Sequence, residues 1–479
     1  MKKALIPFIF LIYAHLTLLS QTHPLVSFNF TTQAQIDNFQ IDHPGVTEIT
    51  GDVTISGDEI LNLYGLEVIT RISGDLWIDN NDSLTTLIGL HNLEYIGGSL
   101  HLAGLGGIQD FTGLEKVAVV GGKFEISFTK ELVNAVGLNQ LTSLGGDLDM
   151  LFNKKLIDLT GLAQLTTING GILAHGNEQL QSLSGLEGIT HVQGNLSLTY
   201  NQELESLNGL NQVSLIDGYL RIEDHGTNLQ NMAGLEQLTE VDSYILIDSN
   251  PGMINLSGLD NLVQANGLHV ENNLEIRSLE GLNQLTILGG SLYLENNNRL
   301  KNLDPLLNLT SITGNIILNW NDSLTSLFGL QHVESGTITD LYFDNNRMLS
   351  NCEIDCVCDF LANPTGTIYI SGNATGCSTT DEVEQLCLVK VPENKLINSI
   401  AVFPNPFEDE LSIVLPDIDV IEVEIQLIDI LGKKMLSQQI AIDNHVLVIK
   451  DIPTYLHSGI YFLKLEYNGM EKTIKVVKR

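Results

Sequence analysis

Apolar residues recur between residues 46 and 351 in a pattern that repeats every 24 residues. A glycine–leucine pair opens the pattern, another glycine follows nine residues later, and the next few residues alternate between apolar and polar. Such alternation predicts a half-buried β-strand. Because each repeat contributes one strand, we expect the strands to stack in parallel, about 4.8 Å apart, into a β-solenoid with one long sheet.

The rest of each repeat places an apolar residue at every third position, as at Leu180, Leu183 and Leu186. This period does not match the 3.6 residues per turn of an amphipathic α-helix. We therefore expect the opposite wall of the solenoid to consist of tight turns, short bridges and 3₁₀-like segments. Glycine is expected where the chain turns a corner with unusual backbone angles.

An asparagine recurs just after most predicted strands. We expect these amides to form a stacked ladder that bonds the backbone of the turn and of the next coil. A metal-binding or catalytic role is the alternative. Leu105, Thr129 and His225 hold the same position in three other repeats and are expected to interrupt the ladder. The ladder residues are Asn81, Asn153, Asn177, Asn201, Asn250, Asn273, Asn297, Asn321 and Asn346.

The combined pattern N-x-x-L-x-x-L-x-G-L-x-x-L-x-x-I-x-G-x-L-x-I resembles the receptor L-domain family, the leucine-rich-repeat-like β-helices of insulin-receptor-type ectodomains and of bacterial and fungal surface proteins. The resemblance covers roughly residues 45–350. It implies a mainly β fold, with a right-handed parallel β-solenoid over residues 46–351, and a role in binding. It does not identify the ligand, because members share the fold and differ in what they bind.

The residue between the two buried positions of each predicted strand points outward, and these residues form a row along the sheet. We expect a ligand on this face, because aromatic and arginine side chains dominate binding energy on rigid platforms. Ordinary strand surface residues are the alternative. The row contains Trp77, His101, Glu125, Asp149, Leu173, Ser197, Arg221, Leu246, His269, Tyr293, Ile317 and Tyr342, and the candidate ligand-binding residues are Trp77, His101, Tyr219, Arg221, Tyr244 and Tyr293.

Residues 1–20 have the features of a signal peptide, because Lys2 and Lys3 precede a short apolar run that ends at the small residue Ser20. Residues 21–45 are expected to form an N-terminal cap. Within it, Thr31 or Thr32 opens a short helix that runs through Ile36 and Phe39.

All five cysteines lie between residues 352 and 387. In an exported protein this predicts a disulfide-stapled C-terminal cap, assigned to residues 352–390, with one thiol left over. A zinc site is the alternative, since Cys356 and Cys358 are close in sequence. The residues alone leave the connectivity open. Similarity to bacterial caps of the same kind implies that Cys352, Cys358, Cys377 and Cys387 form the disulfides and that Cys356 is the odd one.

The 24-residue period is absent from the C-terminal part, where a linker (residues 391–398) precedes a unit of short strands and turns at residues 399–479. This pattern predicts a small β-sandwich. Four blocks in it resemble the type A sorting domain of the type IX secretion system: VFPNPF, DILGK, GIYF and KTIKVVK. The resemblance implies interaction with the type IX secretion machinery, passage through the outer membrane, removal of the domain and attachment to surface lipopolysaccharide. Its motif residues are Pro404, Asn405, Pro406, Gly432, Gly459, Tyr461, Lys475 and Lys478.

Charge narrows the range of partners. The chain has 23 basic and 58 acidic residues, a net charge of −35, which excludes a nucleic-acid partner. No nucleophile, zinc or phosphate-binding motif is present, so we expect no enzyme activity and no cofactor. The alternative is that a calcium ion binds at residues 79–82. We expect a cell-surface or secreted protein that binds a protein or glycan in adhesion. One alternative is a polysaccharide-active enzyme that would use carboxylates such as Asp75, Asp79, Glu125, Asp147 and Asp149. The other alternative is a passive surface-coat protein.

Overall fold

The computed structural model describes residues 27–389 and, in the C-terminal part, residues 401–403, 407, 410–414, 422–429, 432–441, 446–449, 452, 456–467 and 470–478. The expected signal peptide and linker lie outside the described residues. Contacts divide the chain into two units, Met1–Cys387 and Leu388–Arg479. No helix among the described residues is long and apolar enough to cross a lipid bilayer.

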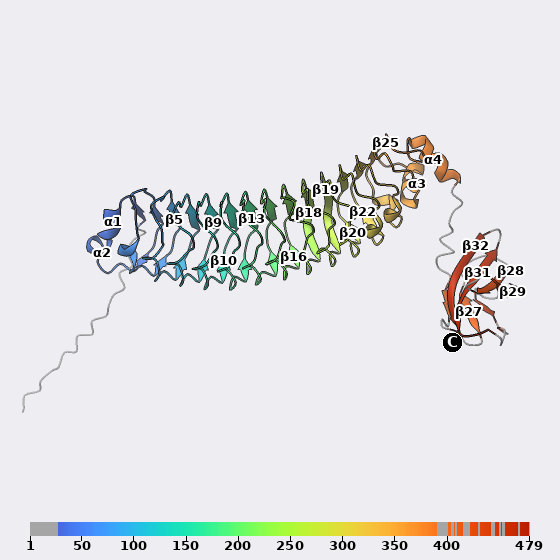
Figure 1. The fold of residues 1–479 in the computed structure, drawn as a ribbon, viewed down its shortest axis with the longest axis horizontal. Helices are drawn as coiled ribbons and strands as arrows, with labels where there is room; N and C mark the ends of the chain where they lie inside the picture. The colour runs from blue at the N-terminus through green and yellow to red at the C-terminus, as the bar shows by residue number, and fades with distance from the viewer. Residues whose placement is uncertain are drawn as a thin grey trace, which may run out of the picture. The chain divides into compact units, whose positions relative to one another are not determined.

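The first unit is the predicted parallel β-solenoid, in which one strand per coil forms a long wall (Figure 1). One continuous apolar core fills the coils from Phe30 to Val383. Neighbouring strands of this main sheet pair in parallel and in register, with one shift between Val241 and Tyr244 in the pairing of the long strands β18 and β19. The strands are β1 (Phe28–Phe30), β3 (Val53–Ile55), β5 (Leu76–Asp79), β7 (Leu100–Ala103), β9 (Phe124–Ser127), β11 (Leu148–Leu151), β13 (Ile172–His175), β15 (Leu196–Thr199), β17 (Leu220–Glu223), β18 (Glu240–Asp248), β19 (Gln264–Glu271), β21 (Leu292–Glu295), β23 (Ile316–Asn319), β24 (Leu341–Asp344) and β25 (Ile368–Ser371).

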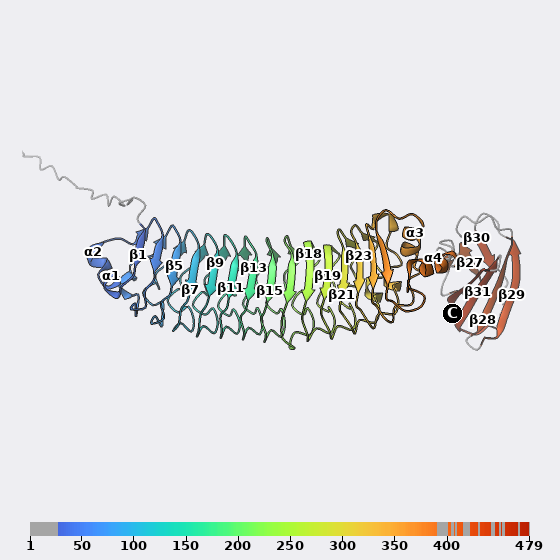
Figure 2. The same ribbon diagram turned by 90° about the horizontal axis from the view of Figure 1, so that it is seen from above.

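Figure 2 shows the strands of the main sheet side by side along the solenoid, and a second wall of two-residue strands runs below them in Figure 1. The expectation of a single sheet was therefore incomplete, because short bridges that recur from β2 to β22 also pair from coil to coil. Here β18 and β19 span both walls. The short strands are β2 (Glu48–Ile49), β4 (Arg71–Ile72), β6 (Tyr95–Ile96), β8 (Val119–Val120), β10 (Ser143–Leu144), β12 (Thr167–Ile168), β14 (His191–Val192), β16 (Leu215–Ile216), β20 (Ile287–Leu288) and β22 (Ser311–Ile312), and the 3₁₀ turns are η1 (Tyr64–Leu66), η2 (Asp304–Leu306), η3 (Phe328–Leu330) and η4 (Ser335–Thr337).

The glycine of the glycine–leucine pair is required by both conformation and space. Gly89 has a φ of 120°, a region that favours glycine. A Cβ atom there would lie 2.1 Å from the carbonyl oxygen of Leu63 in the preceding coil. The corner of the coil therefore cannot hold a side chain, which explains why this glycine recurs.

The asparagine ladder is present, and every one of its nine predicted members is fully buried. Asn201 Nδ2 donates to the Ala174 carbonyl at 3.0 Å, and its Oδ1 accepts the Asn177 N–H at 3.0 Å. The interruption expected at His225 was wrong. The His225 ring lies within hydrogen-bonding distance of the Leu198 carbonyl and the Asn201 N–H, so it replaces an asparagine.

The two other residues expected to interrupt the ladder, Thr129 and Leu105, have different effects on it. Thr129 also remains in the ladder, since its hydroxyl donates to Asn153 Oδ1 at 2.8 Å. Leu105 is a fully buried apolar side chain and does interrupt the ladder. Polarity and size together decide whether a substitute can keep the bonds of an asparagine.

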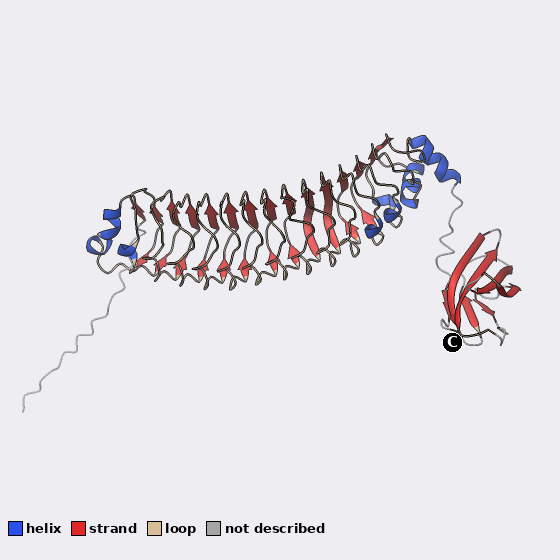
Figure 3. Cartoon of the chain, in the orientation of Figure 1, coloured by secondary structure: helices blue, strands red, loops and turns tan. Residues whose placement is uncertain are grey.

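Two short helices cover the N-terminal end of the core, α1 (Gln33–Asp37) and α2 (Phe39–Asp42) (Figure 3). Thr32 is the N-cap of α1 and forms a capping box with Gln35. Ile36 and Phe39 are buried, and the single short helix that was expected to run through both is divided at Asn38 into α1 and α2. The cap also contributes β1, which extends the main sheet.

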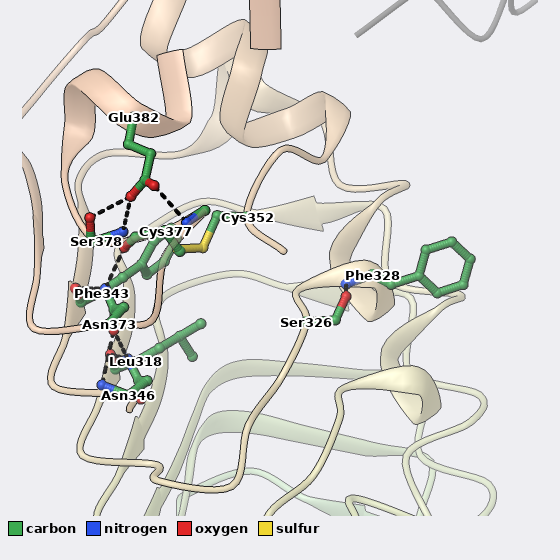
Figure 4. Close-up of a disulfide and its surroundings, with 11 residues drawn as sticks. Leu318, Ser326, Phe328, Phe343, Asn346, Cys352, Asn373, Cys377, Ser378 and Glu382 are labelled. Atoms are coloured by element: carbon green, nitrogen blue, oxygen red, sulfur yellow. Dashed lines mark hydrogen bonds between the residues drawn. A yellow bond between two sulfur atoms is a disulfide. The ribbon is translucent and has the colours of Figure 1, made fainter. Parts of the chain in front are cut away.

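At the C-terminal end, Cys352 bonds to Cys377 and Cys358 bonds to Cys387, while Cys356 is a buried free thiol. Burial raises the pKa of Cys356 to about 12. Figure 4 shows that the first disulfide links consecutive coils next to the end of the ladder, where Asn373 accepts the Asn346 N–H.

The cysteine window thus contains one more coil, with strand β25, rather than only a cap. Within this window, helix α3 (Asp355–Ala362) precedes β25 and helix α4 (Thr380–Val389) follows it. Glu382 of α4 accepts hydrogen bonds from the Gly376 and Ser378 N–H groups. The last coil is therefore tied to α4 by a carboxylate as well as to its neighbour by a disulfide.

The second unit contains two antiparallel sheets that share one apolar core, as expected for a small β-sandwich. All seven of its described strands lie within residues 399–479, where the sequence predicts a unit of short strands. One sheet contains β26 (Ala401–Phe403), β27 (Leu411–Val414) and β30 (Val446–Ile449), and the other contains β28 (Glu422–Asp429), β29 (Lys434–Ala441), β31 (Gly459–Tyr467) and β32 (Met470–Lys478).

Candidate functional site

The predicted outward row exists in the register that the sequence indicates. Trp77 pairs with His101, Arg221 with Leu246, and His269 with Tyr293. The pairing continues without a gap through all twelve predicted positions and is extended by Tyr369 after Tyr342. The strand face therefore presents one side chain per coil along a straight line.

Not every member of the row is accessible. Ser197 is only 5% exposed and Asp149 only 8% exposed, so the expectation that they lie open on the surface was wrong. Ser197 is short and lies between the longer Leu173 and Arg221, while Asp149 is covered by its ion pair with Lys123. Neighbouring side-chain lengths decide accessibility here, and a period-two pattern does not contain that information.

An aromatic column crosses four coils of this face, formed by Tyr219, Tyr244, His269 and Tyr293. The ring centroids of Tyr219 and Tyr244 are 5.3 Å apart, those of Tyr244 and His269 are 5.9 Å apart, and those of His269 and Tyr293 are 5.5 Å apart. The candidate residues Tyr219, Tyr244 and Tyr293 thus belong to one continuous surface, in which each ring supports its neighbours.

A row of carboxylates borders the column at the last position of the same strands. Arg221 pairs with Glu223, the hydroxyl of Tyr293 donates to Glu295, and His269 lies 3.6 Å from Glu271. Burial, together with Glu295, raises the pKa of Tyr293. The acidic positions are in register and comprise Glu223, Asp248, Glu271 and Glu295.

The N-terminal candidates form a separate group. The rings of Trp77 and His101 are stacked with centroids 3.5 Å apart, and Trp77 is 37% exposed. His101 lies 3.6 Å from Glu125, yet burial of the ring lowers its pKa. This pair lies several coils from the aromatic column, so the structure contains two candidate patches on the strand face rather than one.

The carboxylates considered for catalysis are engaged in structural contacts. Lys123 lies 3.0 Å from Glu125 and 2.6 Å from Asp149. Burial raises the pKa of Asp149, and the hydrogen bond from Lys123 lowers that of Glu125.

Two other carboxylates form a second ladder just before the strands. Asp75 accepts the Ser99 N–H at 2.7 Å, and Asp147 accepts the Gly171 N–H at 2.7 Å. Each joins one coil to the next, in the same way that the buried asparagines do.

The proposed calcium loop has other partners. Asn81 belongs to the ladder, and both Asp82 carboxylate oxygens lie 2.9 Å from Lys130 Nζ. In the part of the chain that the structure describes, no three His, Cys, Asp or Glu side chains come together in a metal-binding arrangement.

Sequence reasoning missed a second set of exposed aromatic residues, at the turn that follows the strand. Phe128, Phe152 and Tyr200 occupy the position just before the ladder residue, and His175 lies between them. The available signal was that this position holds asparagine, glycine, aspartate or serine in most repeats and a large ring in a few.

The sorting-motif residues have clear structural positions where they are described. Gly432 has a φ of 82° in the turn before β29, and Gly459 opens β31. The Tyr461 hydroxyl donates to the His457 carbonyl at 2.9 Å. Lys475 and Lys478 lie on β32, whereas residues Pro404, Asn405 and Pro406 lie outside the described residues.

Two family models match the chain. Residues 401–479 match the secretion system C-terminal sorting domain, and residues 188–303 match the receptor L domain. No curated protein matches the sequence. The chain therefore joins a receptor L-domain-like β-solenoid to a sorting domain of the type IX secretion system, which directs it through the outer membrane to the cell surface or the extracellular space.

Proposed function

We propose that the solenoid is a binding scaffold for adhesion and that it contacts a protein partner through the aromatic column. The observation that carries this proposal is the column itself, four supported rings in line on a rigid sheet. Tyrosine rings and Arg221 are the side-chain types that dominate binding energy in protein interfaces. A sorting domain that delivers the chain to the cell exterior is consistent with adhesion.

The charge around the column indicates the kind of partner. The in-register carboxylates beside it and the net charge of −35 favour a partner with a basic surface. Such a contact would weaken as salt is added, because salt screens exposed charges beyond about 10 Å at 0.1 M.

The test is a binding screen of the full chain against host and neighbour-cell surface proteins, followed by the variant Tyr219→Ser, Arg221→Ser, Tyr244→Ser. We expect this variant to lose binding and to keep a melting temperature close to that of the wild type. Trp77→Ser is the matched control, since it removes an exposed ring outside the column. Unchanged affinity in the triple variant would exclude the column, and absence of any partner would favour a passive coat.

We also propose that the chain is not an enzyme. The ion pairs of Lys123 and the ladder role of Asp75 and Asp147 support this, because these carboxylates have structural partners. Release of reducing sugar or of unsaturated sugar ends from a polysaccharide panel, lost in Glu125→Gln and Asp149→Asn, would contradict it.

A further inference from the structure

The residue that directly follows each main strand has a left-handed backbone conformation in most coils. Asparagine, glycine, aspartate or serine holds this position in eight coils between Asn80 and Asn345, and asparagine, glycine and aspartate tolerate it well. Four coils instead carry a large aromatic residue there, with φ values of 54° to 60°, namely Phe128, Phe152, Tyr200 and Trp320.

These aromatic residues are exposed, so burial in a core does not explain them. Phe128 is 59% exposed, Phe152 44% and Tyr200 47%. A bulky residue is strained in this backbone region, and an asparagine would relieve the strain. An exposed ring held in a strained conformation stabilises neither the turn nor the core, which indicates a role in binding.

Three of the rings form a line with His175, which we call the turn-edge row: Phe128, Phe152, His175 and Tyr200. Centroids are 5.2 Å apart for Phe128 and Phe152, 4.8 Å for Phe152 and His175, and 5.2 Å for His175 and Tyr200. Gly176 leaves room for this line, because a Cβ atom there would lie 2.6 Å from the Phe152 ring.

Most of the turn-edge row lies beside strands that end without a carboxylate. The last strand residues here are Ser127, Leu151, His175 and Thr199, whereas Asp79 ends the strand two coils before the row and Glu223 ends the strand directly after it. Nearby lysines have carboxylate partners: Lys130 pairs with Asp82 and Lys155 with Glu131.

One further pair of oppositely charged side chains lies near the row. Lys154 and Glu178 are exposed and occupy equivalent positions of successive coils. The charges beside Phe128, Phe152 and His175 therefore cancel, although the whole chain carries −35, and at the end of the row Tyr200 shares a hydrogen bond with the carboxylate of Asp224. An uncharged ligand meets no electrostatic penalty here, whereas a polyanion would be repelled by the rest of the chain.

The row is long and narrow. An aromatic side chain has about 150–250 Å² of surface, and about half of it is exposed at each of the three rings, so together they offer roughly 300 Å². This is far less than the roughly 800 Å² per partner of a stable protein interface. The rings recur once per coil, and the spacing between coils of about 4.8 Å is close to the length of one hexose unit. Apolar C–H faces of sugars stack on aromatic rings, and polar groups beside the row, such as His175 with Thr199, can bond sugar hydroxyls.

We propose that the turn-edge row binds an uncharged linear polysaccharide that runs along the solenoid axis, independently of the strand face. The test uses isothermal titration of the full chain with cellohexaose, xylohexaose and laminarihexaose, and with a polygalacturonate oligomer as the charged comparison. At least one neutral chain should bind. The variant Phe128→Asn, Phe152→Asn, Tyr200→Asn should weaken that binding at least about tenfold, with a melting temperature equal to or above that of the wild type.

Two controls separate this proposal from the proposed function. Trp320→Asn changes the same kind of strained turn outside the row and should leave glycan affinity unchanged. Tyr219→Ser, Arg221→Ser, Tyr244→Ser should also keep glycan affinity, so a failed protein screen does not affect this result. Binding of none of the neutral chains, tighter binding of polygalacturonate, unchanged affinity in the triple asparagine variant, or self-association that this variant abolishes would each overturn the proposal.

Discussion

Asn201 shows how a single side chain joins neighbouring coils. Its amide bonds the Ala174 carbonyl and the Asn177 N–H of the preceding coil, and its own N–H donates to His225 of the next. Replacement by alanine leaves buried backbone groups without partners, which costs about 1–3 kcal/mol. We expect Asn201→Ala to lower the free energy of unfolding by this amount in chemical denaturation.

Gln164→Ala is the matched control, because Gln164 is an exposed amide on a turn of the same array. Its effect should be close to zero. Ser197, which the sequence suggests as such a control, is unsuitable because it is buried. Equal losses at Asn201 and Gln164 would show that the ladder does not stabilise the coils.

His225 makes the array sensitive to acid. Burial lowers the pKa of this ring to about 4, because the charged form is poorly solvated inside the coil. The unfolded chain binds the proton near pH 6.5, so the contribution of His225 is complete above that pH. It is lost as pH falls toward 4, by on the order of 3 kcal/mol.

His225→Asn should remove this part of the acid sensitivity. Asparagine can accept the Asn201 N–H and donate to the Leu198 carbonyl, as the other ladder members do. Denaturation of both proteins between pH 7 and pH 4 provides the check. If their stabilities decrease in parallel, His225 is not the group responsible.

At the scale of elements, the disulfides constrain only the last coils, across sequence separations of 25 and 29 residues. Bonds that close loops of this size stabilise by about 3 kcal/mol each. Reduction should therefore increase hydrogen exchange first in β24, β25 and α4, and leave β15 protected. Cys356→Ala is the control, since it removes the free thiol and keeps both bonds. Early exchange in β15 would contradict a local role for the disulfides.

The sequence predicts the strand register well, because the period and the alternation together fix which residue of each coil faces outward. It predicts the buried asparagines for the same reason. It does not predict the aromatic column as one surface, since His269 joins Tyr244 only through side-chain orientation. The turn-edge row was missed because a left-handed turn is expected to hold asparagine or glycine, and aromatic rings there oppose local preference.

At the scale of the whole molecule, export and folding reside in different units. The solenoid has its own core and capped ends, and the sorting domain has a separate core. Deleting residues 399–479 should leave the solenoid folded but retained in the periplasm. Protease accessibility on intact cells, compared with cell lysates, measures this. Surface exposure of the truncated chain would show that the sorting domain is not needed.

A further expectation concerns what happens after export. If the sorting domain is removed and the solenoid is attached to lipopolysaccharide, the surface form should migrate as a heterogeneous, larger species in gel electrophoresis. The periplasmic form of the truncated chain should migrate as a single band. A sharp, unmodified band at the surface would contradict attachment.

The coils are nearly identical, so the folding chain needs positions that distinguish one coil from the next, and the ladder positions without asparagine can serve this purpose. A chain of equal repeats could pair one coil out of place during folding and still satisfy most of its hydrogen bonds. Leu105, Thr129 and His225 mark particular coils, because each differs from asparagine in size or polarity at its ladder position. His225→Asn would then produce a chain that better tolerates acid but more often traps misaligned intermediates, because one of its few landmarks is gone.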